Sequence, residues 1–198
     1  MKHLSTFLIL LFITITSLQA QDNKLPYYYQ IPDYPEKYTA ETVVARMIDG
    51  LGFRYYWGTD SLTENDLKFK PSPEARTTGE TIDHIYGLSK VIVNAALKKA
   101  NERSGEEPKY SYEEKRERTL QNFRTASDLL KACESNCLID MTVVFKGKNG
   151  QTEFPFWNNI NGPIADAIWH VGQVVTHRRT SGNPFNSKVS VLRGKLRE

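Results

Sequence analysis

The chain has 198 residues, a formal net charge of +3 and a mean hydropathy of −0.50. This length suits one domain with a sizeable core, and a charge so close to neutral gives no electrostatic support for nucleic-acid binding. Basic residues gather near the C-terminal end, where we interpret them as a solvated tail rather than a phosphate-binding surface: Arg178, Arg179, Lys188, Arg193, Lys195 and Arg197.

The first twenty residues have the pattern of a secretory signal peptide. Lys2 gives a positive start, 4–18 is an apolar run, and Ala20 places a small residue at the cleavage point. A retained anchor is the alternative, but the run is short for a span of about 20 residues. Residues 1–20 therefore predict export to the periplasm or the medium of a bacterium, and no membrane span after cleavage.

Residues 21–38 are rich in tyrosine and proline, which predicts an extended arm that wraps the surface. We interpret its aromatic side chains as packing on helices, with ligand stacking as the alternative. A helix is expected from Thr39, a suitable N-cap, to Trp57-Gly58. Its apolar residues recur at helical spacing and predict one buried stripe: Val43, Val44, Met47, Ile48, Leu51 and Tyr55. A loop follows.

The second predicted helix has a clear start, because Thr77 with Glu80 three residues later forms a capping box. Its apolar stripe predicts that it runs to about Ala100. A break at 104–108 precedes a third helix from Tyr112 to about Ala132, whose charged first half marks an exposed face.

Two β-rich runs in 141–156 flank Asn149-Gly150 and predict a hairpin. A fourth helix is expected from about Asn161 to Thr180, with Pro163 in its first turn. Residues 185–198 are predicted to form a polar surface tail. The fold class expected is all-α, a four-helix bundle over 39–184 with a small β-hairpin inserted between helices three and four.

The two cysteines, Cys133 and Cys137, suit an oxidising compartment. Their spacing is wider than that of a Cys-x-x-Cys redox motif and has no partner pair that would suggest a metal knuckle. A local disulfide at a helix end and two buried thiols both remain open.

The candidate site comprises His84 on the second predicted helix and Asp166 with His170 on the fourth. Asp166 and His170 are four residues apart, so they project from one face of a helix about one turn apart. Imidazole and carboxylate groups suit zinc, nickel, iron or manganese, and three protein ligands leave coordination positions open. Gln173 and His177 lie on the same face and would support the ligands or face a substrate. Each residue also has a structural interpretation, as a hydrogen-bonded histidine or a surface charge.

The helix order, the 77–84 segment and the 170–174 segment resemble the DinB/YfiT-like family of bacterial metal-binding helical bundles. The family motif is a lone histidine early in helix two and a ligand pair four residues apart in helix four, followed by Gly-Gln. His84 and His170 match the outer ligands. Asp166 stands where the family more often has histidine, so the resemblance implies a site of two histidines and one carboxylate.

The resemblance implies an up-down-down-up bundle, often dimeric, so a homodimer is an option here. Characterised relatives include metal-dependent thiol S-transferases and a thiol-dependent maleylpyruvate isomerase. The first hypothesis is an exported metal-dependent transferase or hydrolase of unknown small-molecule substrate. The alternative is a non-catalytic binding or envelope-stress protein on the same fold, in which Asp166 marks a degenerate metal site.

Overall fold

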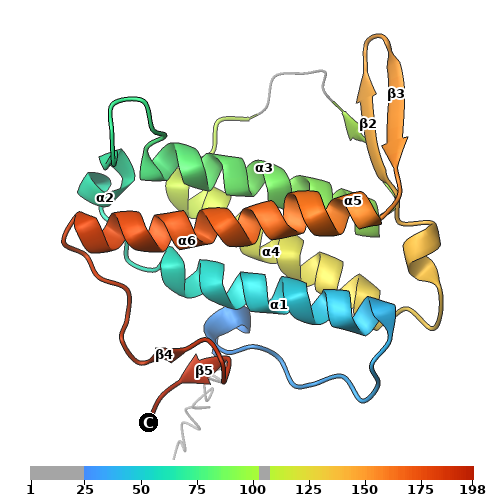
Figure 1. Ribbon diagram of the computed structural model, residues 1–198, viewed down its shortest axis with the longest axis horizontal. Helices are drawn as coiled ribbons and strands as arrows, with labels where there is room; N and C mark the ends of the chain where they lie inside the picture. The colour runs from blue at the N-terminus through green and yellow to red at the C-terminus, as the bar shows by residue number, and fades with distance from the viewer. Residues whose placement is uncertain (1–24, 103–107) are drawn as a thin grey trace, which may run out of the picture.

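The computed structural model describes residues 25–102 and 108–198, and it is mostly helical with a small sheet (Figure 1). The expected helical class is therefore confirmed at this level, and the predicted signal peptide at 1–20 lies outside the described residues. Four long helices dominate the described chain: α1 (Ala40–Gly58), α3 (Thr78–Ala96), α4 (Tyr112–Lys131) and α6 (Ala165–Thr180). The shorter helical elements are η1 (Tyr27–Tyr29), α2 (Glu64–Lys68), η2 (Cys137–Ile139), α5 (Trp157–Asn159) and the π-helical turn η3 (Ile160–Ile164).

Side-chain caps fix where helices begin. Thr77 Oγ1 accepts the backbone N–H of Glu80, and the Glu80 carboxylate accepts that of Thr77, as the sequence predicts. Equivalent boxes start α1 at Thr39, α2 at Thr63 and α4 at Ser111. Each cap satisfies backbone donors that have no partner within the helix.

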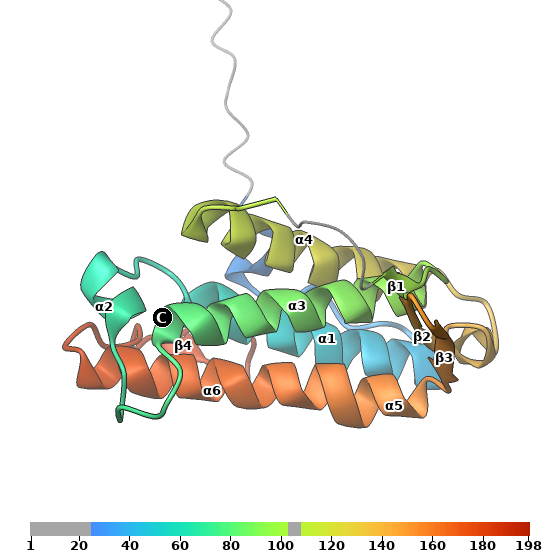
Figure 2. The same ribbon diagram turned by 90° about the horizontal axis from the view of Figure 1, so that it is seen from above.

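The ends of the long helices show their relative directions. The buried Arg178 guanidinium, near the end of α6, donates to the carbonyls of Trp57 and Gly58 at the end of α1. The Tyr112 hydroxyl, at the start of α4, donates to the carbonyl of Thr59. The C-terminal ends of α1 and α6 therefore meet the N-terminal end of α4, and Figures 1 and 2 show α3 running beside α4 from this same end.

The core fills the space between the four long helices. Ile48, Ile85 and Phe123 have no exposed surface and come from three different helices. The Tyr55 ring packs edge-on against Phe123 at 6.0 Å between centroids. Truncating a fully buried side chain of this kind to alanine costs about 2–5 kcal/mol, so this packing holds α1, α3 and α4 against one another.

A small sheet lies at one end of the helices. Strands β2 (Val143–Gly147) and β3 (Gly150–Phe154) pair antiparallel, and β1 (Asn101–Glu102) pairs parallel with β2. The Asn101 amide also donates to the carbonyl of Val144 at 3.0 Å. The third strand was not expected from the sequence, because a two-residue strand has no readable period.

The N-terminal arm differs from the extended segment that was predicted. Tyr28, within η1, is only 1% exposed, and its hydroxyl donates to Asp49 Oδ1 on α1 at 3.2 Å. Tyr28 therefore packs on a helix, as the sequence suggested for the aromatic side chains of the arm. The backbone at this point forms a short helical turn instead of an extended strand.

The C-terminal segment is more ordered than a polar tail. Strands β4 (Val189–Ser190) and β5 (Lys195–Leu196) pair antiparallel. Val189 is buried in a second small core with Phe53 and Trp57 of α1. This apolar anchor, spaced between polar residues, is why the segment does not remain a solvated tail.

Two helix boundaries also differ from the prediction. The helix predicted to start at about Asn161 begins earlier, at Trp157 of α5, and continues through η3 into α6. Pro163 therefore lies inside a continuous helical segment. Proline lacks the N–H that a regular turn would use, and a wide π turn accommodates that loss. Helix α3 ends at Ala96 rather than Ala100, because Lys98 adopts a positive φ of 56°.

A disulfide joins Cys133 and Cys137 after the end of α4. Of the two alternatives left open by the sequence, a local disulfide and two buried thiols, the structure has the disulfide. Among residues 25–102 and 108–198, no helix combines the length and apolar character needed to cross a bilayer.

Candidate metal centre

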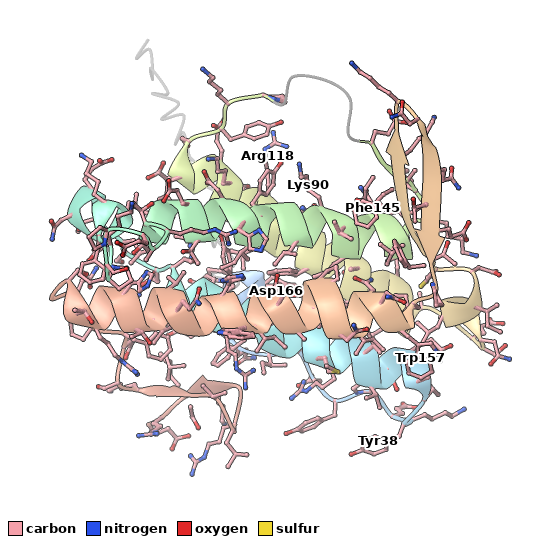
Figure 3. All side chains as sticks on the ribbon, turned by 45° about the horizontal axis from the view of Figure 1, so that its top comes forward. Tyr38, Lys90, Arg118, Phe145, Trp157 and Asp166 are labelled. Atoms are coloured by element: carbon pink, nitrogen blue, oxygen red, sulfur yellow. A yellow bond between two sulfur atoms is a disulfide. The ribbon has the colours of Figure 1, made fainter. Side chains whose placement is uncertain are left out.

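Helices α3 and α6 pack along their length and bring the three predicted ligands together. His84 lies in the second turn of α3, and Asp166 and His170 lie one turn apart on α6. Figure 3 shows Asp166 on the side of α6 that faces α3. The rings of His84 and His170 lie edge to face with 4.7 Å between their centroids, so the required convergence of two helices is present.

One carboxylate contacts both imidazoles. Asp166 Oδ2 lies 3.2 Å from His84 Nε2, and Asp166 Oδ1 lies 3.2 Å from His170 Nε2. One ligand atom from each of the three residues lies within 4.8 Å of the other two. The His170 side chain is 14% exposed, whereas those of His84 and Asp166 are 34% and 38% exposed. The group is therefore partly buried and open to solvent on one side.

Both ring nitrogens of His170 face oxygen atoms. Its Nδ1 lies 2.7 Å from the Gln173 amide oxygen, and its Nε2 faces the Asp166 carboxylate. A neutral imidazole has one N–H and one lone pair, so it satisfies only one of two acceptors. If Nδ1–H donates to Gln173, the Nε2 lone pair points at a carboxylate oxygen. A proton or a metal ion between these two atoms removes that repulsion.

The distances fit a divalent cation. Ligand atoms that each lie about 2.1 Å from a tetrahedral ion are separated by about 3.4 Å. The two 3.2 Å contacts of Asp166 are close to this value but involve different oxygens of its carboxylate, and the three ligand atoms together lie within 4.8 Å of one another. Imidazole and carboxylate donors suit zinc, nickel, iron and manganese alike. The residues present therefore fit a divalent metal but do not select among these ions.

Gln173 and His177 have different surroundings. Gln173 accepts from the His170 ring, which is the orienting contact expected of a group that supports a ligand. His177 instead lies near the end of α6, 3.3 Å from Thr78 Oγ1 and against the Phe69 ring. His177 is not part of the metal-ligand group, because it lies seven residues after His170, a distance of about 10 Å along a helix. Burial lowers the pKa of His177.

Two neighbours of the group were given no role from the sequence. Trp169 is 73% exposed and directly precedes His170 on α6. At Gly87, three residues after His84, a Cβ would meet no other atom within 4 Å. The sequence could have drawn attention to Trp169, because a tryptophan is unusual beside the polar residues of a helix. The open space at Gly87 could not be predicted, because it depends on how the helices pack. The surface of α3 is therefore open at Gly87.

No protein-family model, curated protein or solved structure matches this chain. The geometry of the described residues is therefore the basis for the functional proposals below.

Proposed function

We propose that the chain is an exported, DinB-like metal-binding protein that acts as a metal-dependent transferase or hydrolase on a small molecule. The observation that carries the proposal is the convergence of His84, Asp166 and His170 from two helices on one point. The resemblance to the DinB/YfiT-like family supports the family part of this proposal, and the pattern of residues 1–20 supports a periplasmic or secreted location.

An up-down-down-up four-helix bundle is part of this proposal. Contacts at one end of the helices support it, because Arg178 of α6 binds the end of α1 and Tyr112 of α4 binds Thr59. The contact between Thr78, at the start of α3, and His177, near the end of α6, agrees with this order.

Each residue has a defined part in the proposed centre. His84 and His170 would supply neutral nitrogen ligands, and Asp166 would supply the negative charge that favours a dication over a monovalent ion. Gln173 would hold His170 with its Nε2 lone pair toward the centre. These residues would hold a divalent cation, which would supply Lewis-acid chemistry at an oxygen or sulfur atom of a substrate. The solvent-exposed edges of His84 and Asp166 leave room for that substrate.

The alternative is a non-catalytic binding or envelope-stress protein. The observation that favours it is the double contact of Asp166, since one carboxylate between two histidines also links α3 to α6 without a metal when an imidazole is protonated. In that case the three residues would stabilise the fold rather than bind a ligand.

Metal analysis separates these two functions. Tag-free protein is incubated with zinc, nickel or manganese, passed through a desalting column and analysed for metal content and melting temperature. The enzyme hypothesis predicts about one equivalent of one ion and a higher melting temperature, because a ligand that binds only the native state stabilises it. Below about a tenth of an equivalent with every ion, together with no melting shift, would reject the metal centre.

If metal binds, a His84→Ala, His170→Ala double variant provides the control. It should lose both the metal and the metal-dependent shift in melting temperature. Equal melting of the wild type and the double variant, with or without metal, would instead show that the three residues neither bind an ion nor stabilise the fold.

A further inference from the structure

We propose that the C-terminal β4–β5 hairpin binds the surface of a bilayer rich in anionic lipids. The hairpin lies to one side of the helices, below α6 in Figure 1, and is distinct from the metal centre. The inference does not depend on the proposed function.

The turn of this hairpin exposes an apolar tip. Leu192 is 96% exposed and Val191 is 40% exposed, and both lie between the two strands. Fully exposed leucine is costly to maintain in water and gains free energy when it enters the boundary between headgroups and acyl chains. A turn that needed only to connect two strands would more usually carry polar residues.

Cations surround the tip. Lys188, Arg193, Lys195 and Arg197 are all exposed, and among the described residues none of their side chains has an ion-pair partner. Residues 185–198 contain a single acidic residue, Glu198. Elsewhere on the protein, exposed lysines such as Lys68, Lys98 and Lys146 pair with carboxylates. The hairpin therefore concentrates, in one short segment, exposed cations without carboxylate partners in the part of the chain that the structure describes.

The hairpin is held rigidly enough to present these side chains together. Gly194 donates its N–H to the Ser190 carbonyl at 2.8 Å and accepts the Ile31 N–H at 2.7 Å. Gly194 has a φ of +67°, and a Cβ there would lie 2.8 Å from Ile31, so the hairpin rests directly on the arm. Val189 anchors the other side against Phe53 and Trp57. The tip is therefore fixed with its apolar and basic side chains facing away from the protein.

An exposed apolar tip next to several exposed cations matches a bilayer surface better than a nucleic acid. Lipid headgroups offer negative charge above an apolar layer, so both features are used at once. Phosphate backbones use the cations alone and leave Leu192 exposed. A requirement for Leu192 in binding therefore distinguishes a bilayer from a nucleic acid as the partner.

The test is co-sedimentation of the protein with vesicles of phosphatidylglycerol and phosphatidylcholine, compared with vesicles of phosphatidylcholine alone, in about 0.1 M salt. We expect binding to the anionic vesicles only. Arg193→Glu with Lys195→Glu should lower the partition coefficient by at least about tenfold, since each cation near such a surface contributes about fivefold. Leu192→Asp should lower it by about tenfold or more, because the tip no longer inserts.

Matched controls use the same substitutions elsewhere. Lys148→Glu reverses an exposed charge in the β2–β3 turn, and Ile139→Asp replaces a side chain that is 75% exposed. Both should bind like the wild type, and all variants should melt like the wild type because the changed side chains are exposed.

Three results would overturn the proposal. They are no binding of the wild type to anionic vesicles, unchanged binding by the Leu192→Asp variant, or an equal loss of binding in the controls. Retention of duplex DNA that depends on Arg193 and Lys195 but not on Leu192 would assign the surface to nucleic acid instead.

Discussion

His84 and His170 are held 4.7 Å apart, ring to ring, with the carboxylate of Asp166 in contact with both. The two rings come from helices whose packing is fixed by the core, so their separation does not depend on a mobile loop. This relationship makes the candidate centre testable residue by residue.

Removing either imidazole should abolish metal retention. His84→Ala and His170→Ala each leave only two protein ligands, which is fewer than the three of the usual catalytic zinc sites. We expect metal content after desalting to fall from about one equivalent to below about 0.1. His177→Ala is the matched control, because His177 contacts Thr78 and should leave the metal content unchanged. A His170→Ala protein that keeps a full equivalent would contradict the assignment.

Asp166 should determine the strength of binding. Asp166→Asn keeps the size of the side chain but removes the negative charge, and we expect metal affinity to fall at least about tenfold. Asp166→His introduces the residue that is more common in the DinB/YfiT-like family, which the sequence resembles, and should bind zinc at least as tightly as the wild type. Titration against a chromophoric zinc chelator measures both. Stronger zinc binding by the Asn variant than by the wild type would exclude Asp166 as a ligand.

Gln173 should act through His170. Gln173→Ala removes the acceptor 2.7 Å from Nδ1, so the ring loses its fixed orientation. Loss of such an orienting contact costs about 10–100-fold in metal affinity. Thr176→Ala changes an exposed residue on the same helix and should have no effect on the same titration. An unchanged affinity in the Gln173 variant would remove its orienting role.

The disulfide should stabilise the protein to a modest degree. Cys133 and Cys137 close a short loop, for which the chain-entropy estimate is about 2 kcal/mol. Cys133→Ser with Cys137→Ser should lower the free energy of unfolding in urea by about this amount. A reducing agent should destabilise the wild type similarly and leave the double variant unaffected. Equal sensitivity of both proteins to the reducing agent would contradict this prediction.

Acid stability should report on Asp66. Burial acts to raise the pKa of this carboxyl, but hydrogen bonds from Asn183, Ser181 and Thr63 outweigh it and lower the pKa from 3.8 to about 2. A lowered pKa stabilises the fold above the ordinary value, and the contribution is lost as the pH falls from about 4 to about 2. Asp66→Asn should therefore cost about 2 kcal/mol at neutral pH. The difference from the wild type should shrink across that window, as measured by urea unfolding at each pH.

Local rules predicted the long helices well. The Thr77–Glu80 capping box marks the start of α3, and Thr39 marks that of α1. The five-residue α2 was missed because it is too short for a readable apolar period, although Thr63 and Asp66 form a capping box that could have indicated it. The order of the C-terminal segment was also missed, since it depends on Val189 packing with Phe53 and Trp57.

The candidate site was predictable in its members but not in its contacts. Spacing placed Asp166 and His170 on one face, and His84 on another predicted helix was the candidate third ligand, which the family resemblance matched. That Asp166 contacts both rings, and that His177 lies with Thr78 instead, depends on the register between α3 and α6. Sequence periodicity carries no information on that register, because it describes each helix separately.

The contact between His84 and Asp166 joins positions 82 residues apart in the chain. A growing or unfolded polypeptide cannot present all three donors together, so an ion could load only after most of the domain has assembled. If the protein is exported before it folds, the identity of its native ion will be decided by the metal supply on the far side of the membrane and not by that of the cell interior.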